Sequence, residues 1–248
     1  MSLGFDKSTN IFYGDNAQGK TNILEAVYLS GTTKSHRGTK DRDMIQFGEN
    51  ESHIETIVEK NGIKYQIDMH LKKNSPKGIA INKIPIRKAS ELFGIINIVF
   101  FSPEDLNIIK NGPGERRRFI DLELSQLDKV YLNNLSNYNR IVNQRNHLLK
   151  EIDYNKSALE TLDIWDMQLI QYGSKIIERR QKFIEEINEI IYNIHKKLTG
   201  NRENINIIYE PSNGVLSFEQ ALLKNKEKDL RIKSTSVGPH RDDIAFLV

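Results

Sequence analysis

The chain has 248 residues, of which 28% are charged and 8% aromatic, and its formal net charge at pH 7 is +3. A net charge this small excludes a wholly basic surface, so any nucleic-acid contact has to come from local clusters of Lys and Arg. Cysteine is absent, which excludes disulfides and thiolate chemistry and favours a cytoplasmic protein. Neither a membrane-spanning apolar run nor a signal peptide is present, so we expect no membrane association.

The first elements predict a strand, a loop and a helix. Residues 10–13 (NIFY) are typical of a short strand, and Ile23, Leu24, Val27 and Tyr28 give the following helix one buried face. The stretch between them, GDNAQGKT, satisfies the pattern G-x-x-x-x-G-K-[ST]. The order strand, loop, helix is the context that this phosphate-binding motif requires.

Each residue type in this loop has a chemical reason. Glycines let backbone N–H groups surround phosphates, and the helix N-terminus adds partial positive charge. Lys20 would reach the β- and γ-phosphates, and the Thr21 hydroxyl would ligate Mg²⁺. We therefore predict a nucleotide site, with Thr21 as the metal ligand. Its loop residues are Gly14, Asp15, Asn16, Ala17, Gln18, Gly19, Lys20 and Thr21.

A basic loop follows the predicted helix. It carries Lys34, His36, Arg37, Lys40 and Arg42. Such a loop can lie over the phosphates or face a nucleic-acid backbone, and the alternative is an ordinary solvated loop. We favour a functional role for Arg37 above its neighbours.

The rest of the first hundred residues indicates an α/β fold. Residues 52–73 alternate apolar and polar on both sides of Asn61-Gly62, which predicts a β-hairpin. We expect another strand within residues 77–86, a short helix over 88–93 and a buried strand over 95–101.

Phosphoryl chemistry also requires a carboxylate near the metal, usually at the end of an apolar strand. Glu104 and Asp105 follow residues 95–101, but Ser102-Pro103 intervene, so a role at a helix start is equally compatible. We find no convincing carboxylate of this type, which favours further chain after Val248.

From residue 112 to 200 the apolar spacing of three and four predicts two long antiparallel helices. An unbroken helix over 157–198 would span about 60 Å, which predicts a projecting arm; the alternative is a kink near Gly173. We assign residues 1–111 and 201–248 to a partial head domain. Residues 112–200 are then the helical arm.

Three arginines, Arg116, Arg117 and Arg118, occupy the first turn of a predicted helix, where they oppose the helix dipole. Pairing with Glu115, Asp121 or Glu123, or contact with phosphates, would explain them.

The end of the chain returns to α/β structure. We expect strands over 204–211 and 242–248, with a helix capped by Ser217 between them. His240 lies in the turn SVGPHRDD, where it could act as a base, as a sensor or as a hydrogen-bonded corner. The residues alone leave this open.

Three segments together resemble the RecF family of bacterial recombination mediators, in the same order and at similar separations. They are residues 14–37, 99–124 and 237–243. The resemblance implies an α/β head of the P-loop ABC/SMC ATPase type with an inserted antiparallel helical arm. It also implies an ATP-dependent homodimer that binds DNA at single-strand gaps or junctions and, with RecO and RecR, helps to load RecA.

The resemblance further implies roles for individual residues. Arg37 would lie near the nucleotide and link it to DNA, and Glu104 would occupy the Q-loop position, although that position has no Gln here. We expect the DNA-binding residues to be Lys34, His36, Arg37, Arg116, Arg117 and Arg118.

The chain departs from the family pattern at both ends. The strands that open the family's head are largely missing, as are the signature segment and the Walker B Asp-Glu that should follow GPHRDD. We therefore expect DNA-dependent ATPase activity in a full-length protein, and weak nucleotide binding without turnover in these 248 residues. Two alternatives from other classes are a P-loop kinase acting on a small molecule and a purely structural head of SMC type.

Overall fold

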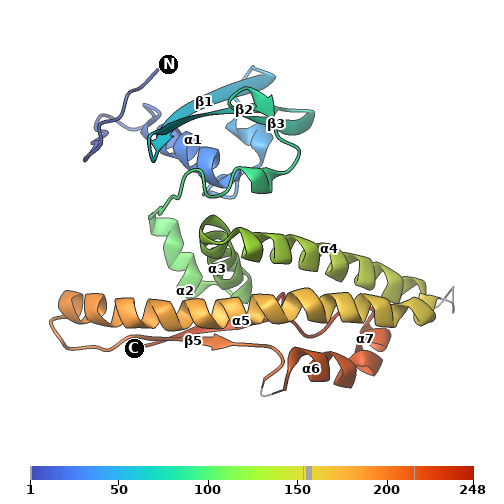
Figure 1. Ribbon diagram of the computed structural model, residues 1–248. Coiled ribbons are helices and arrows are strands. Elements are labelled where there is room, and N and C mark those ends of the chain that lie inside the picture. Colours follow the sequence, from blue (N-terminus) through green and yellow to red (C-terminus); the bar gives the residue numbers. More distant parts are fainter. Residues whose placement is uncertain (1, 153, 155–157, 215) are drawn as a thin grey trace. The chain divides into compact units, whose positions relative to one another are not determined.

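The computed structural model of the protein describes residues 2–152, 154, 158–214 and 216–248 (Figure 1). The chain forms two compact units, Met1–Phe100 and Phe101–Val248. Each unit has its own apolar core, so each is described by itself.

The first unit packs helix α1 (Lys20–Thr32) against an antiparallel sheet with the strand order β1-β2-β3-β4. The strands are β1 (Glu51–Lys60), β2 (Ile63–Lys72), β3 (Ser75–Ile81) and β4 (Ile84–Pro85). Short 3-10 helices cover Asp41–Met44 and Ala89–Glu91. The core lies between α1 and one face of the sheet and consists of Leu29, Ile45, Ile67, Met69, Leu71 and Leu92.

The predicted hairpin over residues 52–73 is confirmed. Asn61 and Gly62 have φ values of 54° and 77°, as a two-residue turn between twisted strands requires, and Lys60 pairs with Ile63 across it. A second such turn at Asn82 and Lys83, with φ values of 51° and 66°, divides the strand expected within residues 77–86 into β3 and β4.

Two predicted strands are absent from this unit. Residues 10–13 and 95–101 contain no strand, and no described strand pairs with either segment. Ile11 is 78% exposed and Val99 is 92% exposed. Apolar composition suits a strand, but a strand forms only where a neighbour takes up its backbone hydrogen bonds. The short helix expected over 88–93 is the 3-10 helix Ala89–Glu91.

The second unit is mainly helical. It begins with a 3-10 helix, Pro103–Leu106, and then contains α2 (Asn107–Lys110), α3 (Pro113–Leu127), α4 (Lys129–Glu151) and α5 (Ala158–Thr199). It ends with β5 (Asn206–Glu210), α6 (Phe218–Lys224), α7 (Lys226–Ile232) and β6 (Asp243–Leu247).

Helices α4 and α5 pack side by side, as the apolar spacing predicted (Figure 1). Asp128 begins α4 by accepting hydrogen bonds from the backbone N–H groups of Val130 (2.8 Å) and Tyr131 (3.0 Å). Helix α5 has 42 residues and is about 63 Å long. It passes Gly173 as one continuous helix, so the alternative of a kink there is wrong. The last apolar positions of the spacing are exposed, with Ile190 at 61% and Ile194 at 51%.

Helix α5 lies between α4 on one side and β5 with α6 on the other (Figure 1). Strands β5 and β6 form an antiparallel pair in which Ile207 faces Phe246, so the strands expected near residues 204–211 and 242–248 are confirmed. Ser217 caps α6 together with Gln220, also as predicted. The expected single helix is divided at Asn225, which ends α6 and precedes α7. The division into a head of residues 1–111 and 201–248 and an arm of residues 112–200 stays a prediction.

Candidate nucleotide-binding site

The loop Gly14–Thr21 combines unusual backbone angles with the start of a helix. Gly14, Ala17 and Gly19 have positive φ values of 141°, 64° and 85°, and α1 begins at Lys20. Gly14 and Gly19 adopt these angles at low cost because they lack a Cβ atom. The residues from Gly14 to Gln18 are exposed, so the loop is accessible to a ligand.

Lys20 lies back across this loop. Its Nζ donates hydrogen bonds to the carbonyl oxygens of Gly14 (2.7 Å) and Asp15 (2.6 Å). The ammonium group is therefore held over the loop. The first N–H groups of α1 lie at the edge of the same loop. Thr21 is exposed in the first turn of α1. This arrangement places a cation, a hydroxyl and helix N–H groups where an anion would approach.

The face of α1 differs from the one predicted. Leu24 is 43% exposed, whereas Leu29 is fully buried in the core. The buried part of α1 is its last turn, from Leu29 to Thr32. Gly31 lies in this turn, where an added Cβ would come within 2.5 Å of the Ile98 side chain, so residues near Ile98 cover α1 closely without forming a strand.

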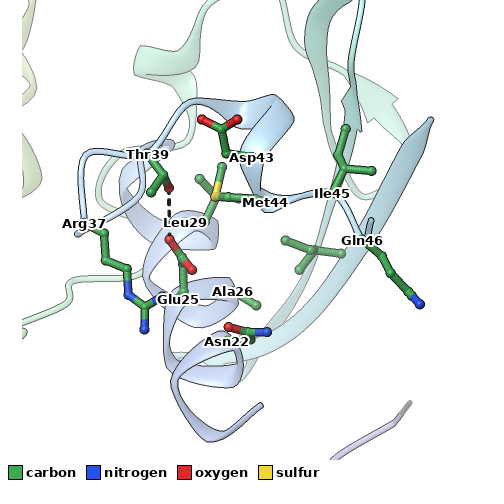
Figure 2. Close-up of a pocket in the computed structure, with 11 residues that line it drawn as sticks. Asn22, Glu25, Ala26, Leu29, Arg37, Thr39, Asp43, Met44, Ile45 and Gln46 are labelled. Carbon is green, nitrogen blue, oxygen red and sulfur yellow. Dashed lines mark hydrogen bonds between the residues drawn. The ribbon is translucent and has the colours of Figure 1, made fainter. Parts of the chain in front are cut away.

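A pocket of about 240 Å³ lies beside α1, bordered by one face of the helix and the segment that follows it (Figure 2). Residues with the helical spacing of three and four, Asn22, Glu25, Ala26 and Leu29, form the helix side. Completing the lining are Arg37, Thr39, Asp43, Met44, Ile45, Gln46 and Ile54. Its walls thus offer amide, carboxylate and guanidinium groups next to apolar surface.

The basic loop brings only part of its charge to this pocket. Arg37 lines the pocket and is exposed, and Lys34 is exposed nearby in sequence. His36 instead packs its ring against Phe100 (4.3 Å between centroids) and Tyr28 (5.7 Å). The roles of these three residues in DNA binding stay predictions.

Sequence reasoning missed the groups that fix this loop. Glu25, Ser35 and Thr39 are joined by hydrogen bonds, and Lys77 of β3 binds the loop from the sheet. The helical spacing of Glu25 with Asn22 and Leu29 could have placed it on the same face, but its partners are ten or more residues away. We found no sequence signal for Lys77.

Glu104 belongs to the second unit, in the 3-10 helix Pro103–Leu106. Asp105 forms a capping box with Ser102, whose backbone N–H donates to the Asp105 carboxylate at 2.5 Å. The helix-start alternative therefore holds for Asp105. The assignment of Glu104 to the Q-loop position stays a prediction.

The three arginines of α3 have different environments. Arg116 forms two hydrogen bonds to the carboxylate of Asp243, from Nε (2.6 Å) and Nη2 (3.0 Å), which holds the pKa of Asp243 below its ordinary value. Arg117 donates to the backbone carbonyl of Asp242 at 2.6 Å. Arg118 is exposed. The first two pair within the protein, although not with the acids expected from sequence, and their role in DNA binding stays a prediction.

His240 is a hydrogen-bonded corner of the turn before β6. Its Nε2 contacts the Thr235 carbonyl at 3.1 Å, so Nε2 carries the proton, and Nδ1 accepts from the Tyr138 hydroxyl at 2.7 Å. Burial lowers the pKa of His240 to about 4. The positive charges of Arg241 and Arg117 act in the same direction, whereas the hydrogen bond to the Thr235 carbonyl acts to raise the pKa. The imidazole is therefore neutral near pH 7, with both nitrogens in use.

Two buried arginines also hold this turn, and sequence reasoning did not identify them. Arg145 of α4 binds Asp166 (2.6 Å), Asp229 (2.7 Å) and Thr235 (2.9 Å). Arg180 of α5 is 1% exposed. In the sequence, Arg145 interrupts the apolar spacing of α4, and its partners lie 21 or more positions away.

No family model matches the chain. The curated protein "DNA replication and repair protein RecF" of Agathobacter rectalis is 64% identical over 248 residues, covering all of this chain and 68% of the relative. The protein of the same description from Clostridium botulinum is 46% identical over 250 residues, covering 98% of this chain and 68% of the relative.

Two solved structures are similar over 99% of this chain and 68% of their own, each with 34% sequence identity. One, described as the recombination mediator protein RecF-ATP in the RecFOR pathway, has a TM-score of 0.93. The other, RecF-ATPrS, has a TM-score of 0.89. The predicted fold class, an α/β head of the P-loop ABC/SMC ATPase type, is confirmed by this likeness, and neither the kinase nor the purely structural alternative receives support. The identity and the coverage together show that the chain belongs to the RecF family of DNA replication and repair proteins.

Proposed function

We propose that the loop Gly14–Thr21 binds ATP with Mg²⁺. The observation that carries the proposal is the loop's geometry: residues with positive φ lead into the N-terminus of α1, and the Lys20 ammonium lies over them. This arrangement suits the polyphosphate of a nucleotide. The similar solved structure described as RecF-ATP supports the choice of nucleotide.

The residues present are compatible with an Mg²⁺ ion whose ligands come mainly from the nucleotide. The described residues contain no group of three or more His, Asp or Glu side chains that could hold a metal. Mg²⁺ in nucleotide sites needs few protein ligands because phosphates and water supply most of its oxygens. The exposed Thr21 hydroxyl, in the first turn of α1, would be one such ligand.

The pocket beside α1 is the place we propose for the nucleoside. It begins at Asn22, one residue after Thr21, and its volume of about 240 Å³ suits a base and ribose. Asn22 and Gln46 offer amide groups, and Met44 and Ile45 offer apolar surface, the combination typical of ligand pockets.

We further propose that the natural protein containing this chain binds DNA at single-strand gaps or junctions, forms a homodimer with ATP and helps to load RecA with RecO and RecR. The words "RecFOR pathway", which describe the two similar structures, support this. Lys34, Arg37 and Arg118 are exposed cations that could contact phosphates. In this proposal residues 1–111 and 201–248 are the head, residues 112–200 the arm, Arg37 links the nucleotide to DNA, and Glu104 takes the Q-loop position.

The decisive experiment measures nucleotide-dependent dimerisation of the natural protein by light scattering, with and without gapped DNA. We expect ATP with Mg²⁺ to shift the wild type to a dimer and Lys20→Ala to remain monomeric. Lys7→Ala, at another exposed lysine of the same unit, is the matched control and should behave as the wild type. A Lys20→Ala protein that dimerises normally with ATP would contradict the proposal.

Arg37→Ala separates the two activities. If Arg37 links the nucleotide to DNA, this variant loses the effect of DNA on dimerisation, whereas Lys20→Ala loses the effect of ATP itself. A metabolite kinase would show no DNA effect in either protein, so wild-type insensitivity to DNA would favour that class instead.

A further inference from the structure

The segment that carries Arg37 is fixed to α1 by the carboxylate of Glu25. Glu25 Oε1 accepts a short hydrogen bond from the Ser35 hydroxyl. It accepts a second, at 3.3 Å, from the Thr39 hydroxyl, which Figure 2 shows as a dashed line. Ser35 is 2% exposed, so its bond to Glu25 is shielded from water. The two hydroxyls lie on either side of Arg37 in sequence, and one carboxylate therefore closes the loop at both flanks.

Ser35 passes this constraint to the backbone of Arg37. Its hydroxyl oxygen accepts the Arg37 N–H at 3.1 Å, and its carbonyl accepts the Gly38 N–H at 3.2 Å. Gly38 has a φ of 71°, which completes a tight turn at low cost. The backbone of Arg37 is thus held while its side chain stays exposed.

The sheet holds the two ends of the same segment through Lys77 of β3. Its Nζ donates to the Thr33 carbonyl and to the Asp41 carboxylate, the latter at 2.8 Å. The Lys77 side chain is 20% exposed. Lys77 therefore joins the beginning and the end of the loop, while Glu25 fixes its middle.

Glu25 also has a defined relation to the phosphate loop. It lies four residues after Thr21, so the two side chains share one face of α1, about one turn apart. Among the described residues the Arg37 guanidinium has no hydrogen-bond or ion-pair partner. A residue whose backbone is fixed and whose charged side chain is unpaired is suited to bind a ligand.

We propose that Glu25 is a positioning residue, which holds the loop Thr33–Asp41 so that Arg37 stands at the rim of the pocket beside the phosphate loop. Lys77 is the second positioning residue and fixes the ends of the loop. The link to nucleotide and DNA rests on the function proposed above, but the anchoring of the loop does not.

The anchoring is tested by amide hydrogen exchange in the natural protein without ligand. Loss of about one hydrogen bond predicts exchange of residues 33–41 that is roughly fivefold faster in Glu25→Ala. Glu25→Gln should stay within about twofold of the wild type, because its amide oxygen can accept the same bonds. Glu59→Ala, at an exposed carboxylate of β1, is the control and should leave these residues unchanged.

For Lys77 the paired variants are Lys77→Ala and Lys83→Ala, since Lys83 is an exposed lysine at the turn after β3. Faster exchange at residues 33–41 only in Lys77→Ala supports the second anchor. Unchanged exchange in both anchor variants overturns the proposal, as does faster exchange spread over the whole first unit.

Coupling to function is tested by a double-mutant cycle on DNA-stimulated dimerisation. We expect Glu25→Ala to lose the DNA effect as Arg37→Ala does, the double variant to be no worse than Arg37→Ala, and Glu25→Gln to restore the effect. Additive losses, or a Gln variant that behaves like Ala, overturn the positioning role. Failure of Lys20→Ala to affect nucleotide binding would instead contradict the proposed function and leave the exchange result standing.

Discussion

Arg180 in the middle of α5 donates a hydrogen bond to the backbone carbonyl of Pro239, 59 residues away in the sequence, at a distance of 2.7 Å. The same guanidinium contacts Asp121 at 2.7 Å and Asp242 at 3.6 Å. Its side chain is 1% exposed, so these contacts have no competition from water. Helix α5 thereby fixes the turn that leads into β6.

We expect Arg180→Met to destabilise the second unit by about 3 to 5 kcal/mol, because it leaves the buried Asp242 and the partly buried Asp121 without their shared cation. The fluorescence of Trp165, the one tryptophan of the chain, reports unfolding of this unit in urea. Arg179→Met is the matched control: its side chain is 25% exposed and its pairs are longer, 3.3 and 3.4 Å, so it should cost at most about 1 kcal/mol. Equal losses in the two variants would contradict this account.

Gly173→Ala should destabilise the protein even though alanine favours a helix by about 1 kcal/mol. An added Cβ would clash with the Phe218 ring and lie 3.0 Å from Tyr138, and such overpacking costs about 1 to 3 kcal/mol. Urea unfolding measures the effect. Phe218→Leu in the same chain should recover part of it.

The control for this substitution is Gly114→Ala in α3, where the nearest side-chain atom is 4.0 Å away. We expect this change to be neutral or slightly stabilising. A neutral Gly173→Ala would show that α5 and α6 separate easily.

His240 should make stability depend on pH. Burial lowers its pKa to about 4 in the folded chain, while an unfolded histidine titrates near 6.5. As the pH falls from about 6.5 to 4, the unfolded chain binds a proton that the folded chain does not, so the free energy of unfolding falls, by at most about 3 kcal/mol.

His240→Gln removes the titrating group, so the difference in unfolding free energy between variant and wild type should shrink as the pH is lowered through this window. Carboxylates titrate in both proteins and cancel in the comparison. A difference that stays constant from pH 7 to 4 would exclude this effect of His240.

Arg116 and Arg118 should separate stability from DNA binding. Arg116→Ala removes the paired contacts to Asp243, and we expect a loss of about 1 to 3 kcal/mol in unfolding free energy. Arg118→Ala, at an exposed site, should change stability by less than about 0.5 kcal/mol.

If Arg118 contacts a DNA phosphate, its removal should reduce the slope of log affinity against log salt by about 1. Titrations of gapped DNA at several salt concentrations measure this slope. An unchanged slope would remove Arg118 from the proposed DNA interface.

Features encoded by neighbouring residues could be predicted from the sequence. The Asn61-Gly62 hairpin, the Ser217 cap and the spacing of α4 and α5 each depend on residues a few positions apart, and the structure confirms them. The phosphate loop was equally local, because its glycines and Lys20 lie within eight residues. The identity of its ligand, ATP, came instead from the resemblance to the RecF family.

Features that depend on distant partners could not be predicted. Residues 10–13 and 95–101 had the composition of strands but pair with no described strand. The acids chosen for Arg116 were close in sequence, whereas its true partner, Asp243, is 127 positions away. The sequence does not show which distant side chains the fold brings together. Long-range pairs such as Lys77 with Asp41 were therefore missed.

The triad of Arg145, Asp166 and Asp229 has a consequence for how this protein can change over evolution. Its members come from α4, α5 and α7 and are all nearly inaccessible to water. Replacing Arg145 alone leaves two carboxylates in the interior without their cation, and replacing both carboxylates leaves the buried guanidinium unpaired, whereas an apolar trio of similar volume can be tolerated. Complete replacement one residue at a time must therefore pass through a state with a single buried charge, and lineages that carry this chain should either retain Arg145 with at least one of its carboxylates or exchange the whole group together.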